Sequence, residues 1–481
     1  MRRAFPASGS GALLRLVAIL TLLTAAIESA TADSGIKVPP FERVQLPNGA
    51  VLLLMERHDV PLVSFTAMLR GGAATDPPDA FGTSSLLAGL LEKGAGKRDA
   101  IQFAETVASV GGQIETGASL ESLWVSGSFL ARDRELMVEL LADMLQRPRL
   151  DAEQFETLRA RRIEFLRAAK DSDLAALVPI YGVANLFGAH PYGRPVNGSE
   201  ASLASIRHSH IERQFREQVG ADRLILALAG DFDTASMKQL LEGAFAGWRK
   251  ASRPLVRPPQ PQPIGGRRVL LVDAPDSVQS YFWAGSLGVP RSDPRRAALD
   301  VTNTLFGGRF TSMLNSELRV RTGLSYGASS RFERLMESGH WQLTSFTQTD
   351  TTVQAIDLAL ATLDKLHEGA LDAAALASAK RYVQGQYPLA FETAGQWAYQ
   401  LATLELYGLD RSYIEGYSAA LEAVSLDEAR KVVEEVYPRS NEVVLVVIGN
   451  AAKIRKELEK YGPLTEMKLA DPVFAPRARG Q

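Results

Sequence analysis

Residues Phe81–Gly94 read Phe-Gly-Thr-Ser-Ser-Leu-Leu-Ala-Gly-Leu-Leu-Glu-Lys-Gly, and this stretch predicts a helix that packs against a core. Its leucines recur at helical spacing and form one apolar stripe: Leu86, Leu87, Leu90 and Leu91. A hydroxyl of Thr83, Ser84 or Ser85 can cap the N-terminus, and Gly94 can end the helix in a left-handed cap. Ser85 and Gly89 stand four residues apart and therefore share one face of the helix.

An inverted zinc-binding motif, His-x-x-Glu-His, places its two histidines four residues apart in the same way. The corresponding string in this chain is Ser85-Leu86-Leu87-Ala88-Gly89. Ser85, Ala88 and Gly89 supply neither the two histidine ligands nor the glutamate that acts as general base. The segment therefore predicts the helix of a zinc site from which the zinc chemistry has been removed.

The N-terminus predicts a secretory signal over residues 1–32. Arg2, Arg3 and Arg15 form a basic region, and an apolar run follows at Leu16–Ile27. Small residues then precede Asp33, where we expect cleavage. The apolar run is short for a membrane span, and no later stretch reaches eighteen apolar residues, so we expect no membrane anchor after cleavage.

Composition excludes several classes of function. The chain has no cysteine, which rules out disulfides, cysteine-ligated metal and thiol catalysis. For an exported protein, this composition favours a bacterial periplasm. The 53 basic and 55 acidic residues are interspersed and give a formal net charge of −2. Because no field of one sign dominates, we expect no nucleic-acid partner.

The order of predicted elements indicates a duplicated α+β chain. A proline-rich linker over residues 251–267 separates residues 33–250 from residues 268–481. Each half begins with two predicted strands, continues with long helices and ends with a helix, an apolar strand and a glycine, at Gly230 and Gly449. Strands and helices grouped in blocks are typical of the α+β class.

Several segments of the chain are similar, in order and spacing, to the pitrilysin/insulinase family of inverted-zincin peptidases. Besides the Phe81–Gly94 helix they are Leu46–Gly49, Arg70–Gly72, Leu186–Gly198, Phe306–Phe310 and Leu318–Tyr326. The resemblance covers nearly the whole mature chain and is strongest to the bacterial branch that is similar to mitochondrial processing peptidase. It implies two homologous halves that close like a clamshell around an unfolded peptide.

The resemblance also shows what is missing. In the family, the two histidines of the motif and a later glutamate hold the zinc, and that glutamate would fall near Phe165 or Leu166. Glu164 is one residue away, a rotation of about 100° on a helix, so we expect it to be a solvated surface residue. Of the six histidines only His208 and His210 form a close pair, and no acid stands at ligand spacing from them. We therefore expect no zinc or other cofactor to be bound by this chain.

Family peptidases use an arginine and a tyrosine, seven positions apart, from the second half. The resemblance assigns these roles to Arg319 and Tyr326, with Gly323 permitting the turn between them. A phenol can donate to a developing oxyanion, and a guanidinium can bind peptide carbonyls. Arg321 is the alternative arginine. A purely structural interpretation makes Arg319 an ion-paired surface residue, with Glu317 or Glu333 as its partner, and Tyr326 a core aromatic.

The bacterial branch includes pairs in which one subunit carries the zinc motif and its companion carries the Arg/Tyr pair. We therefore hypothesise that the chain is a non-catalytic subunit of a heterodimeric periplasmic zinc endopeptidase. Its partner would be a homologous zinc-bearing subunit, and its substrate an extended peptide. Gln113, Ile114, Glu115 and Thr116 are candidates for a sheet edge to which the peptide adds as a strand. The alternatives are a structural subunit of the same fold and a chaperone-like peptide-binding module.

Overall fold

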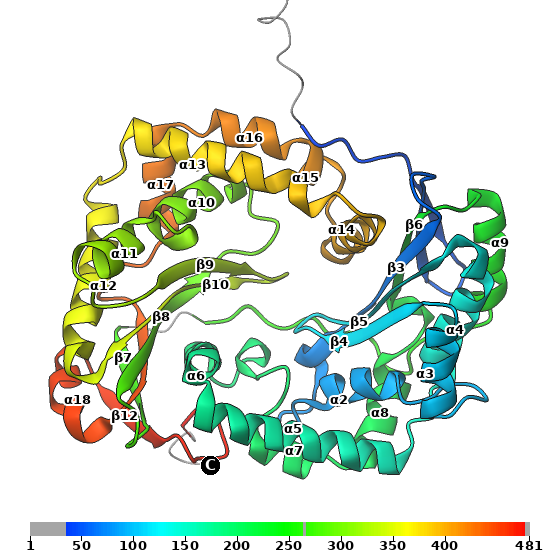
Figure 1. Ribbon diagram of the computed structural model, residues 1–481, viewed down its shortest axis with the longest axis horizontal. Coiled ribbons are helices and arrows are strands. Elements are labelled where there is room, and N and C mark those ends of the chain that lie inside the picture. The colour runs from blue at the N-terminus through cyan, green and yellow to red at the C-terminus, as the bar shows by residue number, and fades with distance from the viewer. Residues whose placement is uncertain (1–34, 263–265, 477–481) are drawn as a thin grey trace, which may run out of the picture.

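Two mixed sheets, each covered by helices, face each other around a central space (Figure 1). The computed structural model describes residues 35–262 and 266–476, so the secretory signal predicted over residues 1–32 lies outside the described residues. Within the described ranges, no helix combines the length and the apolar character that a membrane crossing requires.

The first sheet has the strand order β1-β2-β6-β3-β5-β4. Its strands are β1 (Glu42–Gln45), β2 (Val51–Glu56), β3 (Leu62–Arg70), β4 (Gln113–Ala118), β5 (Ser122–Leu130) and β6 (Leu224–Gly230). β2 and β6 run parallel, whereas β3 is antiparallel to both β6 and β5. Every residue of β6 is buried, which agrees with its unbroken apolar sequence and its position inside the sheet.

The second sheet repeats this plan. Its strands are β7 (Arg268–Asp273), β8 (Gln279–Gly288), β9 (Ala328–Arg334), β10 (Gly339–Gln348), β11 (Val444–Gly449) and β12 (Leu464–Lys468). The order β7-β11-β8-β10-β9 matches β2-β6-β3-β5-β4 strand for strand, with the same parallel and antiparallel pairs. The outermost strands differ, because β1 is antiparallel to β2 whereas β12 is parallel to β7. The α+β class and the repeated half are thus confirmed.

Helices of the first half cover the outer face and one end of its sheet, except for α6, which packs on the second sheet. They are α2 (Thr83–Leu91), α3 (Ala100–Ser109), α4 (Arg134–Gln146), α5 (Ala152–Ser172), α6 (Leu174–Phe187), α7 (Glu200–Ser205), α8 (His208–Gln218) and α9 (Thr234–Phe245). The predicted leucine stripe of α2 is fully buried against this core.

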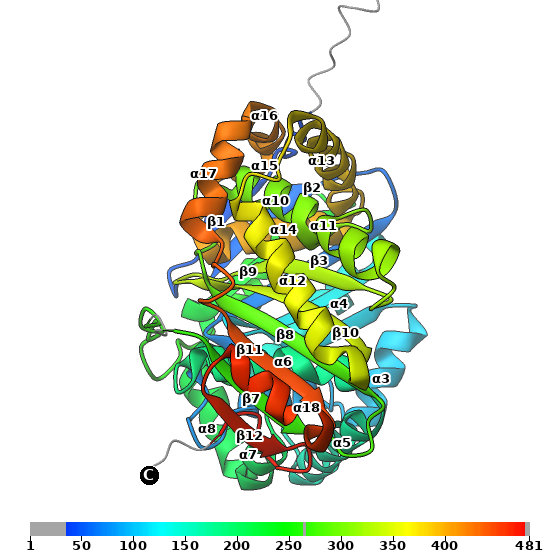
Figure 2. The same cartoon turned by 90° about the vertical axis from the view of Figure 1, so that its left-hand side faces the viewer.

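The second half has a corresponding set of helices, seen face-on in Figure 2. They are α10 (Arg296–Asn303), α11 (Met313–Asn315), α12 (Thr352–His367), α13 (Ala373–Gln386), α14 (Ala394–Tyr407), α15 (Ser412–Glu415), α16 (Tyr417–Ala423), α17 (Leu426–Val436) and α18 (Ala451–Leu458). α12 lies along the outer face of the second sheet, over β10 (Figure 2).

Each half gives one helix to the other half's sheet. α14 packs on β3 and β6 of the first sheet, where Trp397 and Leu401 share a core with Met55 and Ile225. Conversely, α6 packs on β8 and β11 of the second sheet (Figure 1). Because of this exchange, one hydrophobic core contains residues from both sides of the proline-rich segment.

The packing of α6 on the second sheet depends on a close approach between Gly182 of α6 and Trp283 of β8. A Cβ atom added at Gly182 would lie 2.6 Å from Cε2 and 2.7 Å from Cε3 of the indole ring. Carbon atoms pack at about 3.5–4.0 Å, so no larger residue fits there without moving the ring. Glycine at 182 therefore lets the backbone of a first-half helix lie directly on a fully buried tryptophan of the second sheet.

Residues 251–262 contain no helix and no strand. Their path is held at several points: Nε2 of His190 donates to the carbonyl oxygen of Pro259 at 2.8 Å, and Nε2 of Gln260 donates to Glu337 at 3.1 Å. The Nδ1 atom of His190 accepts from the backbone N–H of Tyr192, so this side chain has a structural role.

Candidate functional site

The N-terminus of α2 is held by a buried carboxylate that the sequence did not reveal. Asp76 accepts hydrogen bonds from the backbone N–H groups of Gly82 and Ser84, at 2.8 and 3.0 Å, and from the Ser84 hydroxyl at 2.6 Å. The prediction that Thr83, Ser84 or Ser85 caps the helix is therefore wrong, because Gly82 is the cap residue and Asp76 supplies the acceptor. Burial raises the pKa of Asp76 to about 7, against the lowering effect of its three donors.

The C-terminal end of α2 also differs from expectation. The helix ends at Leu91 with Glu92 in a right-handed conformation, so Gly94 is not the cap. Gly94 does have a positive φ of 105°, but it lies three residues beyond the end of the helix, in the following turn. The helix is therefore shorter at this end than the glycine signal indicates.

The three degenerate motif positions lie on the part of α2 that faces α5. The hydroxyl of Ser85 donates to Oδ1 of Asn197 at 2.8 Å, and Nη1 of Arg162 donates to the same oxygen at 2.6 Å. Ala88 is fully buried. At Gly89 an added Cβ would lie 2.8 Å from Cδ2 of Leu158, so Leu158 fills the space of a side chain there.

These residues do not fit a zinc ion. A serine hydroxyl already committed to an amide, a methyl group and a glycine offer no imidazole or carboxylate ligand, and Arg162 brings a cation to the same place. Throughout residues 35–262 and 266–476, no group of three histidine, aspartate or glutamate side chains is arranged to hold a metal ion.

The other residues weighed as metal ligands have structural roles. Glu164 is exposed on α5 and pairs with Arg167 at 2.7 Å, as expected of a surface residue. His208 packs against Phe155 with ring centroids 5.8 Å apart. The Nδ1 atom of His210 accepts from the backbone N–H of Arg207 and closes the N-terminus of α8.

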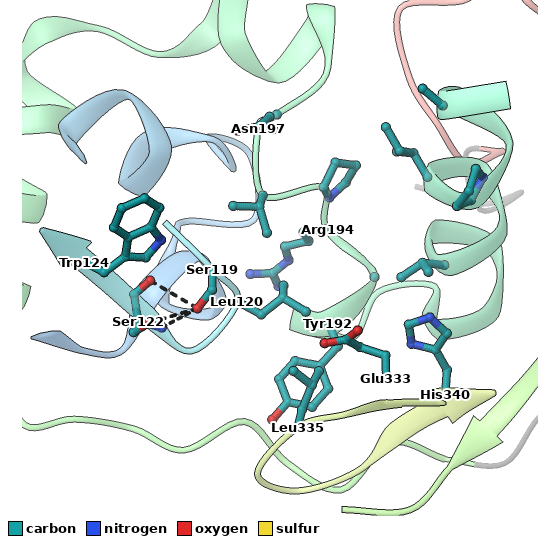
Figure 3. Close-up of a pocket in the computed structure, with 18 of the residues that line it drawn as sticks. Ser119, Leu120, Ser122, Trp124, Tyr192, Arg194, Asn197, Glu333, Leu335 and His340 are labelled. Carbon is teal, nitrogen blue, oxygen red and sulfur yellow. Dashed lines mark hydrogen bonds between the residues drawn. The ribbon is translucent and has the colours of Figure 1, made fainter. Parts of the chain in front are cut away.

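A chamber of about 770 Å³ lies between the two sheets (Figure 3). Strands β3, β4 and β5 of the first sheet and β9 and β10 of the second line it, together with α5 and the two exchanged helices α6 and α14. Trp124 and Leu120 on one side face Leu335 and His340 on the other, and the loop from Tyr192 to Asn197 lies between them (Figure 3). A volume of this size is typical of pockets that enclose a ligand.

A buried glutamate connects the two halves at the chamber wall. Glu121, in the β4–β5 turn, is 7 % exposed and accepts from the backbone N–H of Met336 at 2.9 Å. It also accepts from the hydroxyl of Tyr192. Burial, and then the nearby carboxylate, raise the pKa of Tyr192 well above its usual range. The hydroxyl therefore stays protonated and able to donate this bond.

His340 of β10 is a buried titratable group of the same chamber. Its Nε2 lies 3.2 Å from Oε1 of Gln342, which also accepts from Nε1 of Trp283 at 3.1 Å. Nδ1 of His340 has no partner among the described residues. Burial lowers the pKa of His340 to about 4, and the positive charge of Arg331 adds to the effect. The imidazole is therefore neutral at neutral pH.

The candidate substrate-binding residues lie on an edge strand. Gln113, Ile114, Glu115 and Thr116 all belong to β4, which ends the sheet order and pairs with β5. Of these four residues, Glu115 lines the chamber and is exposed. No second strand among the described residues pairs with β4, so its outer edge has the geometry that strand addition requires.

Arg319 and Tyr326 lie outside this chamber. Arg319 is in the π-helical turn η6 (Ser316–Arg321), and Tyr326 follows it, after Gly323, which has a φ of 65°. Tyr326 is 77 % exposed, so the interpretation of this residue as a core aromatic is wrong. Neither residue is among those that line the space between the sheets.

The two rival arginines have different partners. Arg321 is ion-paired with Glu317 one turn earlier. The guanidinium of Arg319 instead lies 4.6 Å from the ring centroid of Phe310 and has no carboxylate partner among the described residues. The structural interpretation that pairs Arg319 with Glu317 or Glu333 is therefore wrong. Of the two arginines, Arg319 is the one left free to bind another group.

Sequence analysis did not identify Arg162, Asn197 or Glu121 as site residues. Asn197 belongs to the matched segment Leu186–Gly198, which was the one available signal, but its contact with Ser85 spans 112 positions. Arg162 is one of several arginines on a polar helix, and the sequence does not distinguish it from its neighbour Arg161.

Comparisons with known proteins agree with this geometry. A profile of the insulinase family, peptidase family M16, matches residues 53–200, and a profile of the M16 inactive domain matches residues 205–383. An uncharacterized zinc protease of Mycobacterium tuberculosis is 26 % identical over 85 % of this chain and 93 % of its own length. A protein of Helicobacter pylori named as a non-peptidase homolog is 22 % identical over 83 % of this chain and 91 % of its own.

Solved structures share the fold at lower identity. A structure from Pseudomonas fluorescens, described as a peptidase M16 inactive domain, has a TM-score of 0.79 at 20 % identity, covering 85 % of this chain and 98 % of that one. A protease from Helicobacter pylori has a TM-score of 0.78 at 18 % identity, covering 85 % and 99 %. The two profile matches, over residues 53–200 and 205–383, show that the chain belongs to the insulinase family, peptidase family M16.

Proposed function

We propose that this chain is a non-catalytic subunit of a heterodimeric zinc metalloendopeptidase that acts in the periplasm. Its partner is a homologous subunit that carries the zinc motif and the metal, and the substrate is an extended peptide. The lack of metal ligands at Ser85, Ala88 and Gly89 supports the assignment of the zinc ion to the partner subunit. The match of the second half to the M16 inactive domain supports it as well.

The observation that carries the proposal is the outward position of Tyr326. An exposed tyrosine that makes no contact with its own chamber is available to a second molecule. Phe310, which contacts Arg319, and Val320, the next residue along the chain, are also exposed, at 63 % and 74 %, so the surface around Arg319 is apolar as well as charged. Exposed apolar patches of this kind favour a protein interface.

The chemistry of the pair suits peptide hydrolysis in the partner's site. The phenol of Tyr326 donates a hydrogen bond to the oxygen that becomes negative when the scissile carbonyl is attacked. The guanidinium of Arg319 binds backbone carbonyls of the peptide and fixes its position. Phe310 keeps that guanidinium on the surface through a cation–π contact, while no carboxylate of the described residues pairs with it.

Reconstitution with a zinc-bearing homologue from the same genome tests this proposal. In the mixture, Tyr326→Phe is expected to lower kcat/KM for a fluorogenic peptide by on the order of 10²-fold, because one oxyanion donor is lost. Tyr382→Phe is the matched control, since Tyr382 is an exposed tyrosine of α13 in the same half. Sedimentation of both mixtures shows whether the subunits still associate. An unchanged rate with Tyr326→Phe in an intact complex contradicts the catalytic role and favours the structural alternative.

A further inference from the structure

Four arginines line the chamber, and two of them, Arg162 and Arg194, belong to its first-half wall. Arg162 of α5 uses Nη1 to donate to Asn197, and Arg194 uses Nη1 to donate to the backbone oxygen of Asp76 at 3.0 Å. Within residues 35–262 and 266–476, no carboxylate lies at ion-pair distance from either guanidinium. Since each guanidinium has five N–H donors, most of the donors on both side chains remain unused.

Both side chains are partly withdrawn from water. Burial lowers the pKa of Arg162 and of Arg194, although the carboxylate of Asp76 acts in the opposite direction on Arg194. A cation that loses hydration without gaining an ion-pair partner carries a cost that an incoming anion removes. This arrangement is what an anion-binding wall requires.

The wall is also fixed in position. Asn197 is held from one side by Ser85 of α2 and from the other by Arg162 of α5. The loop that carries Arg194 begins at Tyr192, whose hydroxyl is bound to the buried Glu121. In Figure 3 the side chain of Arg194 extends from this loop into the space between Leu120 and Asn197. Little ordering is therefore needed when a ligand binds.

We propose that Arg162 and Arg194 bind a single carboxylate of a peptide inside this chain's own chamber. The guanidinium fork matches a carboxylate and forms charge-assisted hydrogen bonds to it. Leu120, Trp124 and Val196 line the same space and suit the apolar parts of a peptide. The carboxylate is either the C-terminus of the peptide or an aspartate or glutamate side chain, because both present the same group.

Other charges line the same chamber. Glu115 on the edge strand, Glu333 on β9 and Asp173 at the start of α6 are acidic, whereas Arg291 and Arg331 are basic. Asp173 is engaged with the backbone N–H of Ala176, and Glu115 is exposed and repels an anion that lies near it. This binding belongs to the single chain and does not depend on the zinc-bearing partner.

Fluorescence anisotropy of the purified chain tests the proposal with three labelled pentapeptides. The probes are pentaalanine with a free C-terminus, pentaalanine amide, and Ala-Ala-Glu-Ala-Ala amide. We expect at least one of the two carboxylate probes to bind roughly tenfold or more tightly than pentaalanine amide. The probe that gains affinity identifies whether the C-terminus or the side chain supplies the carboxylate.

Variants then locate the site. Arg162→Gln and Arg194→Gln are each expected to reduce the preference for the carboxylate to within about twofold. Arg161→Gln, on the exposed face of the same helix, is the matched control and keeps it. Circular dichroism shows whether each variant is folded. Equal binding of acid and amide probes, no detectable binding of the acid probes at about 1 mM, or a preference that persists in both folded variants overturns the proposal.

Discussion

Replacing Gly182 by alanine tests the exchange of helices between the halves. The added methyl group would lie well inside the contact distance of the Trp283 ring, so the ring must move by about 1 Å. Trp283 is fully buried and donates to Gln342 at 3.1 Å, and both its packing and this hydrogen bond are disturbed. Overpacking of a core costs about 1–3 kcal/mol and a lost hydrogen bond about 1 kcal/mol.

One effect opposes this loss. Alanine is better than glycine in a helix by about 0.5–1 kcal/mol, so the expected net destabilisation of Gly182→Ala is about 1–3.5 kcal/mol. Gly243→Ala in α9 is the matched control, because an added Cβ there meets nothing within 4 Å. That variant should gain only the higher helix propensity of alanine, so its free energy of unfolding should rise by about 0.5–1 kcal/mol.

Urea unfolding measures the two free energies, and hydrogen exchange locates the change. We expect amides of β8 and β11, in the second sheet, to exchange between about tenfold and a hundredfold faster in Gly182→Ala. They should be affected more than β3 of the first sheet, although residue 182 belongs to the first half of the chain. If Gly182→Ala is as stable as Gly243→Ala, or if amides lose protection from exchange only in the first sheet, the described packing of α6 on the second sheet is wrong.

Three other predictions concern the site residues. In the reconstituted mixture, Arg319→Gln should lower kcat/KM by about tenfold or more, whereas Arg321→Gln should not, because Glu317 already holds Arg321; equal effects of the two would contradict the assignment. Because burial lowers the pKa of His340 to about 4 from 6.5, the unfolded chain binds a proton that the folded chain excludes. Its contribution to stability is complete above pH 6.5 and is lost as the pH falls toward 4, by up to about 3 kcal/mol. Urea unfolding at several pH values should show a weaker acid dependence for His340→Gln, and an unaltered dependence would argue against a neutral buried imidazole. Finally, Glu115→Gln should tighten binding of the carboxylate probes about twofold, since one repelling charge is removed, and weaker binding would place Glu115 among the groups that hold the ligand.

Elements with a strong periodic pattern could be predicted from the sequence, and elements that depend on distant contacts could not. Leu62–Arg70, one of the two strands expected at the start of the first half, forms β3, and Thr352–His367, one of the long helices expected in the second half, forms α12, because local pattern and burial agree there. The cap of α2 was missed because its acceptor, Asp76, stands outside the helix and looks like any loop aspartate. The exchange of α6 and α14 has no local signature, since both are apolar helices that could pack on either sheet.

The features of the candidate site also fall into those that the sequence predicted and those that it did not. The loss of ligands at Ser85, Ala88 and Gly89 was readable because a motif fixes which positions to compare. The exposure of Tyr326 was not, because an aromatic residue near a strand is more often buried. The interaction of Ser85, Asn197 and Arg162 joins three separate segments, and only the folded chain brings them together.

The most direct test of the proposed function is peptide cleavage by three preparations: this chain alone, its zinc-bearing homologue alone, and an equimolar mixture. We expect little cleavage by either subunit alone and strong, zinc-dependent cleavage by the mixture. Strong zinc-dependent cleavage by this chain alone would contradict the proposed function, as would a mixture no more active than the zinc-bearing subunit by itself.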